Sequence, residues 1–154
     1  MGIPFTLTYG EARVEGLHAE AALRYKLKLP TGKETVVVEG LRFCYDLSET
    51  DAMILFELLK GGEYSVDDLT QILKLSKATV NRSLSKLVEI GFVSRTREKK
   101  AGVGRPRYKY YIDDPEAVLL RIIQDFENCS RAFSEALRDI LKMIKSHQEK
   151  RKTE

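Results

Sequence analysis

The pattern of hydrophobic and polar residues changes twice along the chain. In the first third, apolar and basic residues alternate from Leu23 to Leu29, which is the period of a half-buried strand. The turn-forming residues Pro30 to Lys33 follow, and the β-branched run Thr35 to Val38 comes next. This order predicts a β-hairpin over about 22–41.

The stretch before this hairpin has no single interpretation. Residues 11–22, EARVEGLHAEAA, fit either a short helix or another strand. We therefore expect residues 1–45 to form a β-rich N-terminal extension, a small sheet that accompanies the domain after it.

The second pattern is helical, and polar caps mark where each helix begins. Ser48 with Asp51 three residues later resembles a capping box, Ser65 caps a second helix, and Ser76 caps a third over 76–90. Gly91 is a typical helix end. The residues expected to anchor the second and third helices in the core are Leu69, Ile72 and Leu73, and Val80, Leu84, Leu87 and Val88.

Two strands joined by a glycine turn follow the three helices. The first opens at Phe92, the turn lies at 101–104, and the second strand spans about 108–112. Three helices followed by a β-hairpin is the order of a winged helix-turn-helix domain. The expected fold class is α+β, with this domain at residues 46–113.

The third pattern is one long amphipathic helix within residues 114–154. Asp114 and Pro115 are an N-cap and a first-turn proline, and apolar residues then recur at steps of three and four to about Ser146. One winged domain has no obvious surface that covers such a stripe, so we expect a second subunit to cover it with the same helix. The predicted dimer interface contains Leu119, Ile122, Ile123, Phe126, Cys129, Phe133, Leu137, Ile140, Leu141 and Ile144.

Positive charge is concentrated in one part of the chain. Residues 74–109 contain eleven Lys and Arg against two Glu, a local net of +9, whereas the whole chain carries +3. The remainder therefore carries −6. A local basic surface of this kind is typical of proteins that bind a polyanion such as nucleic acid.

The third helix presents small polar and basic side chains opposite its apolar face. Asn81 has the chemistry to pair with adenine, and Arg82 with guanine or phosphate. A solvated helix face is the alternative interpretation. The candidate contacts on this helix are Ser76, Lys77, Thr79, Asn81, Arg82, Ser85 and Lys86.

The hairpin after this helix carries seven cations and one acid in fifteen residues. Gly102 and Gly104 allow a flexible tip that can approach a groove closely, and residues 104–107 form a narrow cationic segment suited to a minor groove. An ordinary soluble hairpin is the alternative. The candidate contacts are Arg95, Arg97, Lys99, Lys100, Arg105 and Arg107.

The segment from Leu47 to Tyr111 resembles the winged helix-turn-helix domain of archaeal and bacterial regulators, close to the TrmB-like and MarR-like groups. The resemblance implies a homodimer that places one recognition helix per subunit in successive major grooves. It rests on the segments 69–73, 76–84, 87–93 and 104–108, which read LTQIL, SKATVNRSL, LVEIGFV and GRPRY.

Other chemistries have little support in the sequence. Cys44 and Cys129 cannot by themselves form a disulfide framework or a four-ligand zinc site, and His18 and His147 are far apart. Nucleophile–base motifs, phosphate loops and dinucleotide-binding turns are absent. We expect no metal, no cofactor and no enzymatic activity. No stretch approaches the roughly 18 to 20 apolar residues of a membrane span, and the expected location is the cytoplasm, associated with the nucleoid.

Two functions remain in competition. The first is a sequence-specific transcriptional regulator that binds double-stranded DNA as a homodimer, with half-sites about one helical turn apart, 34–36 Å. The second is an abundant architectural protein that binds DNA with low sequence specificity. A protein-interaction module of the transcription machinery is a third class. The sequence identifies no small-molecule effector.

Overall fold

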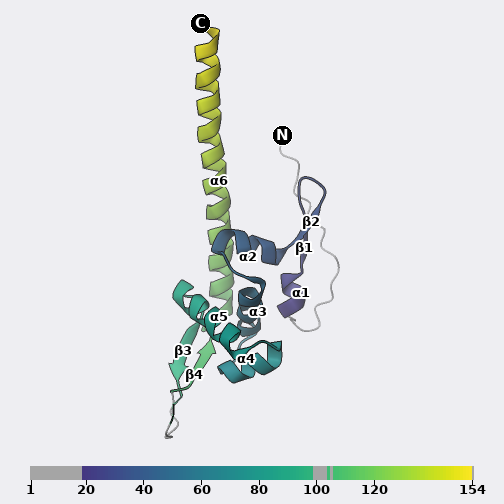
Figure 1. Cartoon of the computed structure of the whole chain (residues 1–154), viewed down its shortest axis with the longest axis vertical. Coiled ribbons are helices and arrows are strands. Elements are labelled where there is room, and N and C mark those ends of the chain that lie inside the picture. The colour runs from purple at the N-terminus through teal and green to yellow at the C-terminus, as the bar shows by residue number, and fades with distance from the viewer. Residues whose placement is uncertain (1–18, 99–103, 105, 154) are drawn as a thin grey trace. The chain divides into compact units, whose positions relative to one another are not determined.

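The computed structural model describes residues 19–98, 104 and 106–153, which form two compact units. The first unit ends at Val118 and the second begins at Leu119, within one continuous helix. The elements in chain order are α1 (Ala19–Leu23), β1 (Lys26–Lys28), β2 (Glu34–Val36), α2 (Val37–Tyr45), α3 (Glu49–Leu59), α4 (Val66–Leu73), α5 (Lys77–Ile90), β3 (Ser94–Arg97), β4 (Tyr108–Tyr111) and α6 (Pro115–Lys152), as Figure 1 shows.

The N-terminal hairpin is shorter than the sequence predicted. Strands β1 and β2 pair antiparallel over only three residues each, and the chain then enters α2 at Val37. The predicted hairpin is confirmed, with residues 35 and 36 in its second strand, whereas the extension of that strand to residue 38 and of the hairpin to residue 41 is wrong. The side chains of Val38 and Leu41 are both buried, at 6% and 2% exposure. Because burial at this helical spacing stabilises a helix, it outweighs the β-propensity of the valines.

The described end of the ambiguous stretch is helical, since α1 begins at Ala19. The expectation of a mostly β-structured extension is thus wrong for the described residues, where α1 and α2 contain more residues than β1 and β2. The predicted strand content of residues 3–18 lies outside the described residues.

The predicted caps of the three central helices are confirmed. Ser48 Oγ accepts a hydrogen bond from the Asp51 backbone N–H at 3.1 Å, and the Asp51 carboxylate accepts one from the Ser48 N–H at 2.9 Å. Ser65 and Asp68 make the same reciprocal pair at 3.0 and 2.8 Å. Gly91 ends α5 with a left-handed φ of 92°, a conformation that glycine adopts without steric cost.

The core of the first unit lies among α3, α4 and α5. Leu69 and the expected α5 residues Val80, Leu84 and Leu87 are fully buried, but Ile72 is 49% exposed, so its assignment to the core is wrong. Ile72 is three positions after Leu69 and hence about 60° from it around the helix, so it lies at the edge of the buried face rather than at its centre. The other fully buried large side chains are Leu41, Leu47, Ile54, Leu55 and Leu58.

The hairpin β3–β4 forms a second antiparallel sheet with the register Arg95↔Tyr110 and Arg97↔Tyr108. Tyr64, in the segment between α3 and α4, adds an isolated bridge to this sheet. Its backbone N–H donates a hydrogen bond to the Tyr110 carbonyl at 2.9 Å, and its own carbonyl accepts one from the Tyr110 N–H at 2.8 Å. The hairpin is therefore fixed to the helical core at its base.

Helix α6 forms the second unit from Leu119 onward, and its first turn, residues 115–118, belongs to the first unit. Asp114 caps it, since its carboxylate accepts a hydrogen bond from the Ala117 N–H at 3.1 Å. The helix continues to Lys152, so the predicted end near Ser146 is six residues too early. Its basic last turn, Lys150 to Lys152, favours this continuation because cations stabilise a helix C-terminus.

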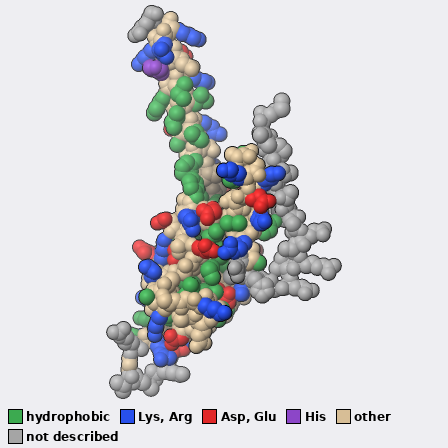
Figure 2. Space-filling view, turned by 45° about the vertical axis from the view of Figure 1, so that its right-hand side comes forward, with side chains coloured by type: hydrophobic (Ala, Val, Ile, Leu, Met, Phe, Trp, Pro, Cys, Tyr) green, Lys and Arg blue, Asp and Glu red, His purple; other side chains and the backbone are tan. Residues whose placement is uncertain are grey.

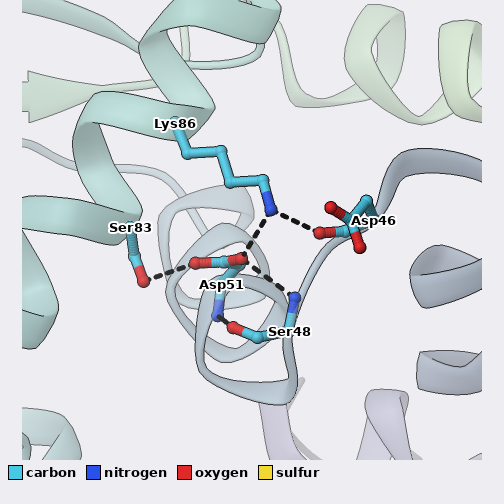
Figure 3. Close-up of polar contacts among 5 residues, drawn as sticks. All are labelled: Asp46, Ser48, Asp51, Ser83 and Lys86. Atoms are coloured by element: carbon cyan, nitrogen blue, oxygen red, sulfur yellow. Dashed lines mark hydrogen bonds and ion pairs between the residues drawn. The ribbon is translucent and has the colours of Figure 1, made fainter.

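A buried carboxylate joins α3 to α5 (Figure 3). Asp51 has a side-chain exposure of 8%, and its Oδ1 accepts a hydrogen bond from Ser83 Oγ at 2.5 Å. Lys86 Nζ lies 3.5 Å from Asp51 Oδ2 and also donates to the backbone carbonyl of Asp46, the C-cap of α2. Together these contacts link three helices at one point.

Burial by itself raises the pKa of Asp51, because it disfavours the charged carboxylate. Hydrogen bonds from Ser83 and Ser48 oppose this effect, and the charge of Lys86 adds to them. The net result is a pKa below the ordinary value for aspartate. The folded protein therefore holds this carboxylate in its ionised form.

We expect Ser83→Ala to lower the free energy of unfolding by about 1–3 kcal/mol at neutral pH, because buried Asp51 loses a hydrogen-bond donor. Urea denaturation followed by circular dichroism measures this change. Ser85→Ala removes the same hydroxyl from an exposed position of α5 and should change the free energy by less than about 0.5 kcal/mol. Equal effects of the two substitutions would contradict a stabilising hydrogen bond from Ser83 to Asp51.

We also expect Asp51 to contribute to acid sensitivity. Its pKa is lower in the folded than in the unfolded state, so its stabilising effect is complete above the unfolded pKa of about 3.9 and is lost as the pH falls through the folded pKa. Asp51→Asn should be less stable at pH 7 and should lose less further stability below about pH 4. Denaturation midpoints between pH 7 and pH 2 test this, and parallel curves for the two proteins would refute it.

Candidate nucleic-acid interface

The surface of α5 opposite the core is polar and basic. Val80, Leu84 and Leu87 anchor the helix with no exposure, and the opposite face follows from their spacing. Of the residues predicted to contact nucleic acid there, five are exposed: Ser76, Lys77, Asn81, Arg82 and Ser85.

Two of the predicted contacts, Ser76 and Lys77, also interact with other residues of the chain at the N-terminus of α5. Ser76 Oγ accepts a hydrogen bond from the Thr79 N–H at 3.2 Å, and the two hydroxyl oxygens lie 2.7 Å apart. Lys77 Nζ lies 3.5 Å from Asp67 Oδ1, with both side chains more than half exposed. Such an exposed pair is weak and breaks easily in favour of a phosphate.

Lys86 does not join this surface. Its ammonium is occupied by Asp51 and the Asp46 carbonyl, and the residue is only half-exposed. A buried carboxylate that lost this cation would pay a large desolvation cost. The structure therefore gives Lys86 an internal role in place of the predicted external one.

The sequence-based interpretation missed two features of α5. Ser83 was not recognised as a buried residue, because its partner Asp51 is 32 positions away and no local pattern connects them. Glu89 is exposed and lies seven residues after Arg82, hence on nearly the same face two turns later. The negative charge of Glu89 near the C-terminus of α5 restricts the surface that can bind an anion to the first half of the helix.

The hairpin separates its cations onto two faces. Directly paired residues of antiparallel strands share a face, so the register places Arg95, Arg97, Tyr108 and Tyr110 together. The guanidinium carbon of Arg95 lies 4.5 Å from the centroid of the Tyr108 ring, a distance typical of a cation–π contact. Arg95 and Arg97 are both exposed.

Lys109 lies on the other face and contacts acids. Its Nζ is 3.5 Å from Asp68 Oδ2 of α4 and 3.6 Å from Glu98 Oε1. The pKa of Asp68 is lowered first by the backbone hydrogen bond from Ser65, and Lys109 adds to this effect. Lys109 thus contributes to the attachment of the hairpin, whereas Arg107 is exposed, opposite Glu98. The predicted contacts Lys99, Lys100 and Arg105 lie outside the described residues.

Hydrophobic side chains run along the surface of α6, where Figure 2 draws them in green. Of the ten predicted interface residues, seven are between 40% and 64% exposed: Leu119, Ile123, Phe133, Leu137, Ile140, Leu141 and Ile144. Phe126 and Cys129 are half-buried and Ile122 is buried within the single chain. An apolar face of this size is unusual for a protein that remains monomeric.

Other kinds of site find no support in the described part of the chain. Among those residues, no group of three or more His, Cys, Asp or Glu side chains is arranged to hold a metal ion. None of the helices in this part of the chain combines the length and the hydropathy that a membrane span requires.

The chain is similar to known regulators in sequence and in fold. Residues 41–116 match the family described as "Sugar-specific transcriptional regulator TrmB". A comparison with curated protein sequences finds no significant match.

Solved structures of archaeal proteins share the fold. The ST1889 protein of Sulfolobus tokodaii is 32% identical over 65% of this chain and 93% of its own, with a TM-score of 0.55. A possible transcriptional regulator from Methanosarcina mazei Go1 is 23% identical over 78% and 97%, with a TM-score of 0.63. Residues 41–116 are thus similar to the TrmB family of transcriptional regulators, and the chain shares its fold with the two archaeal proteins.

Proposed function

We propose that this protein is a homodimeric regulator that recognises a specific sequence of double-stranded DNA. The observation that carries the proposal is the exposed face of α5, where Asn81, Arg82 and Ser85 stand opposite an apolar anchor. Side chains of these types can read base edges in a major groove, which admits a single helix.

Base readout and phosphate contact are assigned to different residues. Asn81 and Arg82 have the donors and acceptors for adenine and guanine edges, while Ser76 and Lys77 lie at the helix N-terminus, where phosphates are favoured. Arg95, Arg97 and Arg107 of the hairpin contribute affinity through phosphates or the minor groove. Lys99, Lys100 and Arg105 belong to the same proposed contact by their position in the sequence.

The proposed dimer forms through α6. Its exposed apolar residues, including Leu137, Ile140 and Ile144, recur at the spacing of a helix–helix seam. Two recognition helices held at a fixed distance read two half-sites, and one helical turn, about 34–36 Å, is the expected separation. Among the predicted contacts, Thr79 is half-buried and its hydroxyl lies 2.7 Å from that of Ser76, and Ile122 is already buried within one chain.

An architectural protein with low sequence specificity is the second candidate. The observation that favours it is the cluster of exposed hairpin arginines, since contacts from Arg95, Arg97 and Arg107 to phosphates carry no sequence information. Genome-wide mapping of bound sites separates the two functions. Discrete sites support the regulator, and uniform coverage that rises with protein concentration supports the architectural protein.

We expect Arg82→Ala to weaken binding to a selected DNA site by about 1–3 kcal/mol, the typical value of a bidentate base contact. Binding to random DNA should change much less. Fluorescence anisotropy with the two duplexes at one salt concentration measures both. Arg131→Ala, which removes the same charge from an exposed position of α6, is the control. Equal losses of Arg82→Ala on both duplexes would argue against base readout.

The hairpin should behave differently. Arg97→Ala removes one proposed phosphate contact, so it should weaken binding to selected and random DNA alike. It should also reduce the slope of log affinity against log salt concentration by about 0.9. Titrations between 50 and 300 mM salt, roughly the range over which such slopes are resolved, provide the measurement. A slope unchanged from that of the wild type would exclude a phosphate contact by Arg97.

A further inference from the structure

The apolar face of α6 is wider than the seam of a two-stranded coiled coil. Two columns of side chains repeat at intervals of seven residues, as positions a and d of a heptad do. One column contains Leu119, Phe126, Phe133 and Ile140, and the other contains Ile123, Ser130, Leu137 and Ile144.

A third column extends this face on one side. It lies one position before the second column and contains Ile122, Cys129, Ala136 and Met143. In a two-stranded coil the flanking positions are usually charged. A helix that faces the core of a bundle is instead apolar at the two seam positions and at one flanking position, which is the pattern of α6.

The width is greatest near the C-terminal end. Five large apolar side chains occur within eight residues and form what we name the distal cluster: Leu137, Ile140, Leu141, Met143 and Ile144, with exposures of 64%, 48%, 49%, 68% and 50%. At about 100° per residue, Leu141 and Met143 lie on opposite flanks of the seam that Ile140 and Ile144 form. One partner helix that covers the seam leaves both flanks in water.

Charge around the distal cluster allows like helices to approach one another. Between residues 134 and 149, three cations are balanced by three acids, so the segment has no net formal charge. The cations Arg138, Lys142 and Lys145 lie outside the three apolar columns. A surface for an acidic partner or for DNA would instead carry an excess of cations.

We propose that two dimers associate through their distal clusters, so that four α6 helices form a bundle and the assembly carries four winged domains. The proposal depends on the dimer of the proposed function. The occupant is a second pair of this chain, because a partner must match the same seven-residue repeat and carry no opposing net charge. Such a tetramer holds two pairs of recognition helices and can bind two DNA segments at once.

The test is the mass of the full chain in solution, measured by light scattering after gel filtration over a wide range of concentrations. The wild type should have four times the chain mass of 17.6 kDa. Met143→Lys places a charge on one flank of the distal cluster and changes none of the ten residues of the predicted dimer interface. It should give a dimer with unchanged helix content and unchanged affinity for one selected DNA site.

Two further variants complete the design. Arg138→Ala changes an exposed charged position in the same turn and should remain a tetramer. Leu137→Glu places a charge in the seam and should give a monomer whose affinity for the selected site falls at least tenfold, because two linked half-sites become one.

The outcomes separate the two proposals. A wild type that is a dimer at every concentration overturns the tetramer and leaves the regulator intact. A wild-type monomer with full affinity for the selected site overturns both the dimer and the tetramer. A tetramer that survives Met143→Lys overturns the role of the distal cluster.

Discussion

The buried carboxylate of Asp51 is the constraint on which the rest of the first unit depends. An ionised group with 8% exposure needs several donors to offset its desolvation, and it obtains them from α5 as well as from its own helix. Because the hydroxyl of Ser83 must point at Asp51, the rotation of α5 about its axis is fixed. Asn81 and Arg82 then face outward as a consequence of an internal hydrogen bond.

The same principle divides the cations of the basic region. Lys86 and Lys109 lie near carboxylates of the same chain, so they hold α5 and the hairpin in place. Arg82 and Arg97 have exposed side chains that can contact an external anion. A net charge counted from the sequence treats these groups as equal. Only the three-dimensional arrangement distinguishes a cation that stabilises the fold from one that can contact DNA.

The sequence predicted those features whose causes are local. The capping pairs at Ser48 and Ser65 and the glycine that ends α5 all depend on residues a few positions apart. The errors have non-local causes. The helix at Val37 is stabilised by burial against other elements, and Lys86 turns inward because Asp51 lies 35 positions earlier in the sequence. Neither partner leaves a signal in the local pattern.

In the proposed dimer and tetramer, helix α6 connects the fold of one chain to the geometry of the assembly. Its charged side chains are almost confined to the face opposite the three apolar columns, so the free energy available from burial is directed toward other helices. Burial of a large apolar side chain contributes roughly 1.5–3 kcal/mol. Burial of all five side chains of the distal cluster would therefore contribute a larger free energy of association than a single weak contact does. In the proposed assembly, the number of helices that cover this face sets how many winged domains act together. A regulator of this kind can acquire cooperativity on DNA through the flanks of a single helix, without any change in its recognition surface.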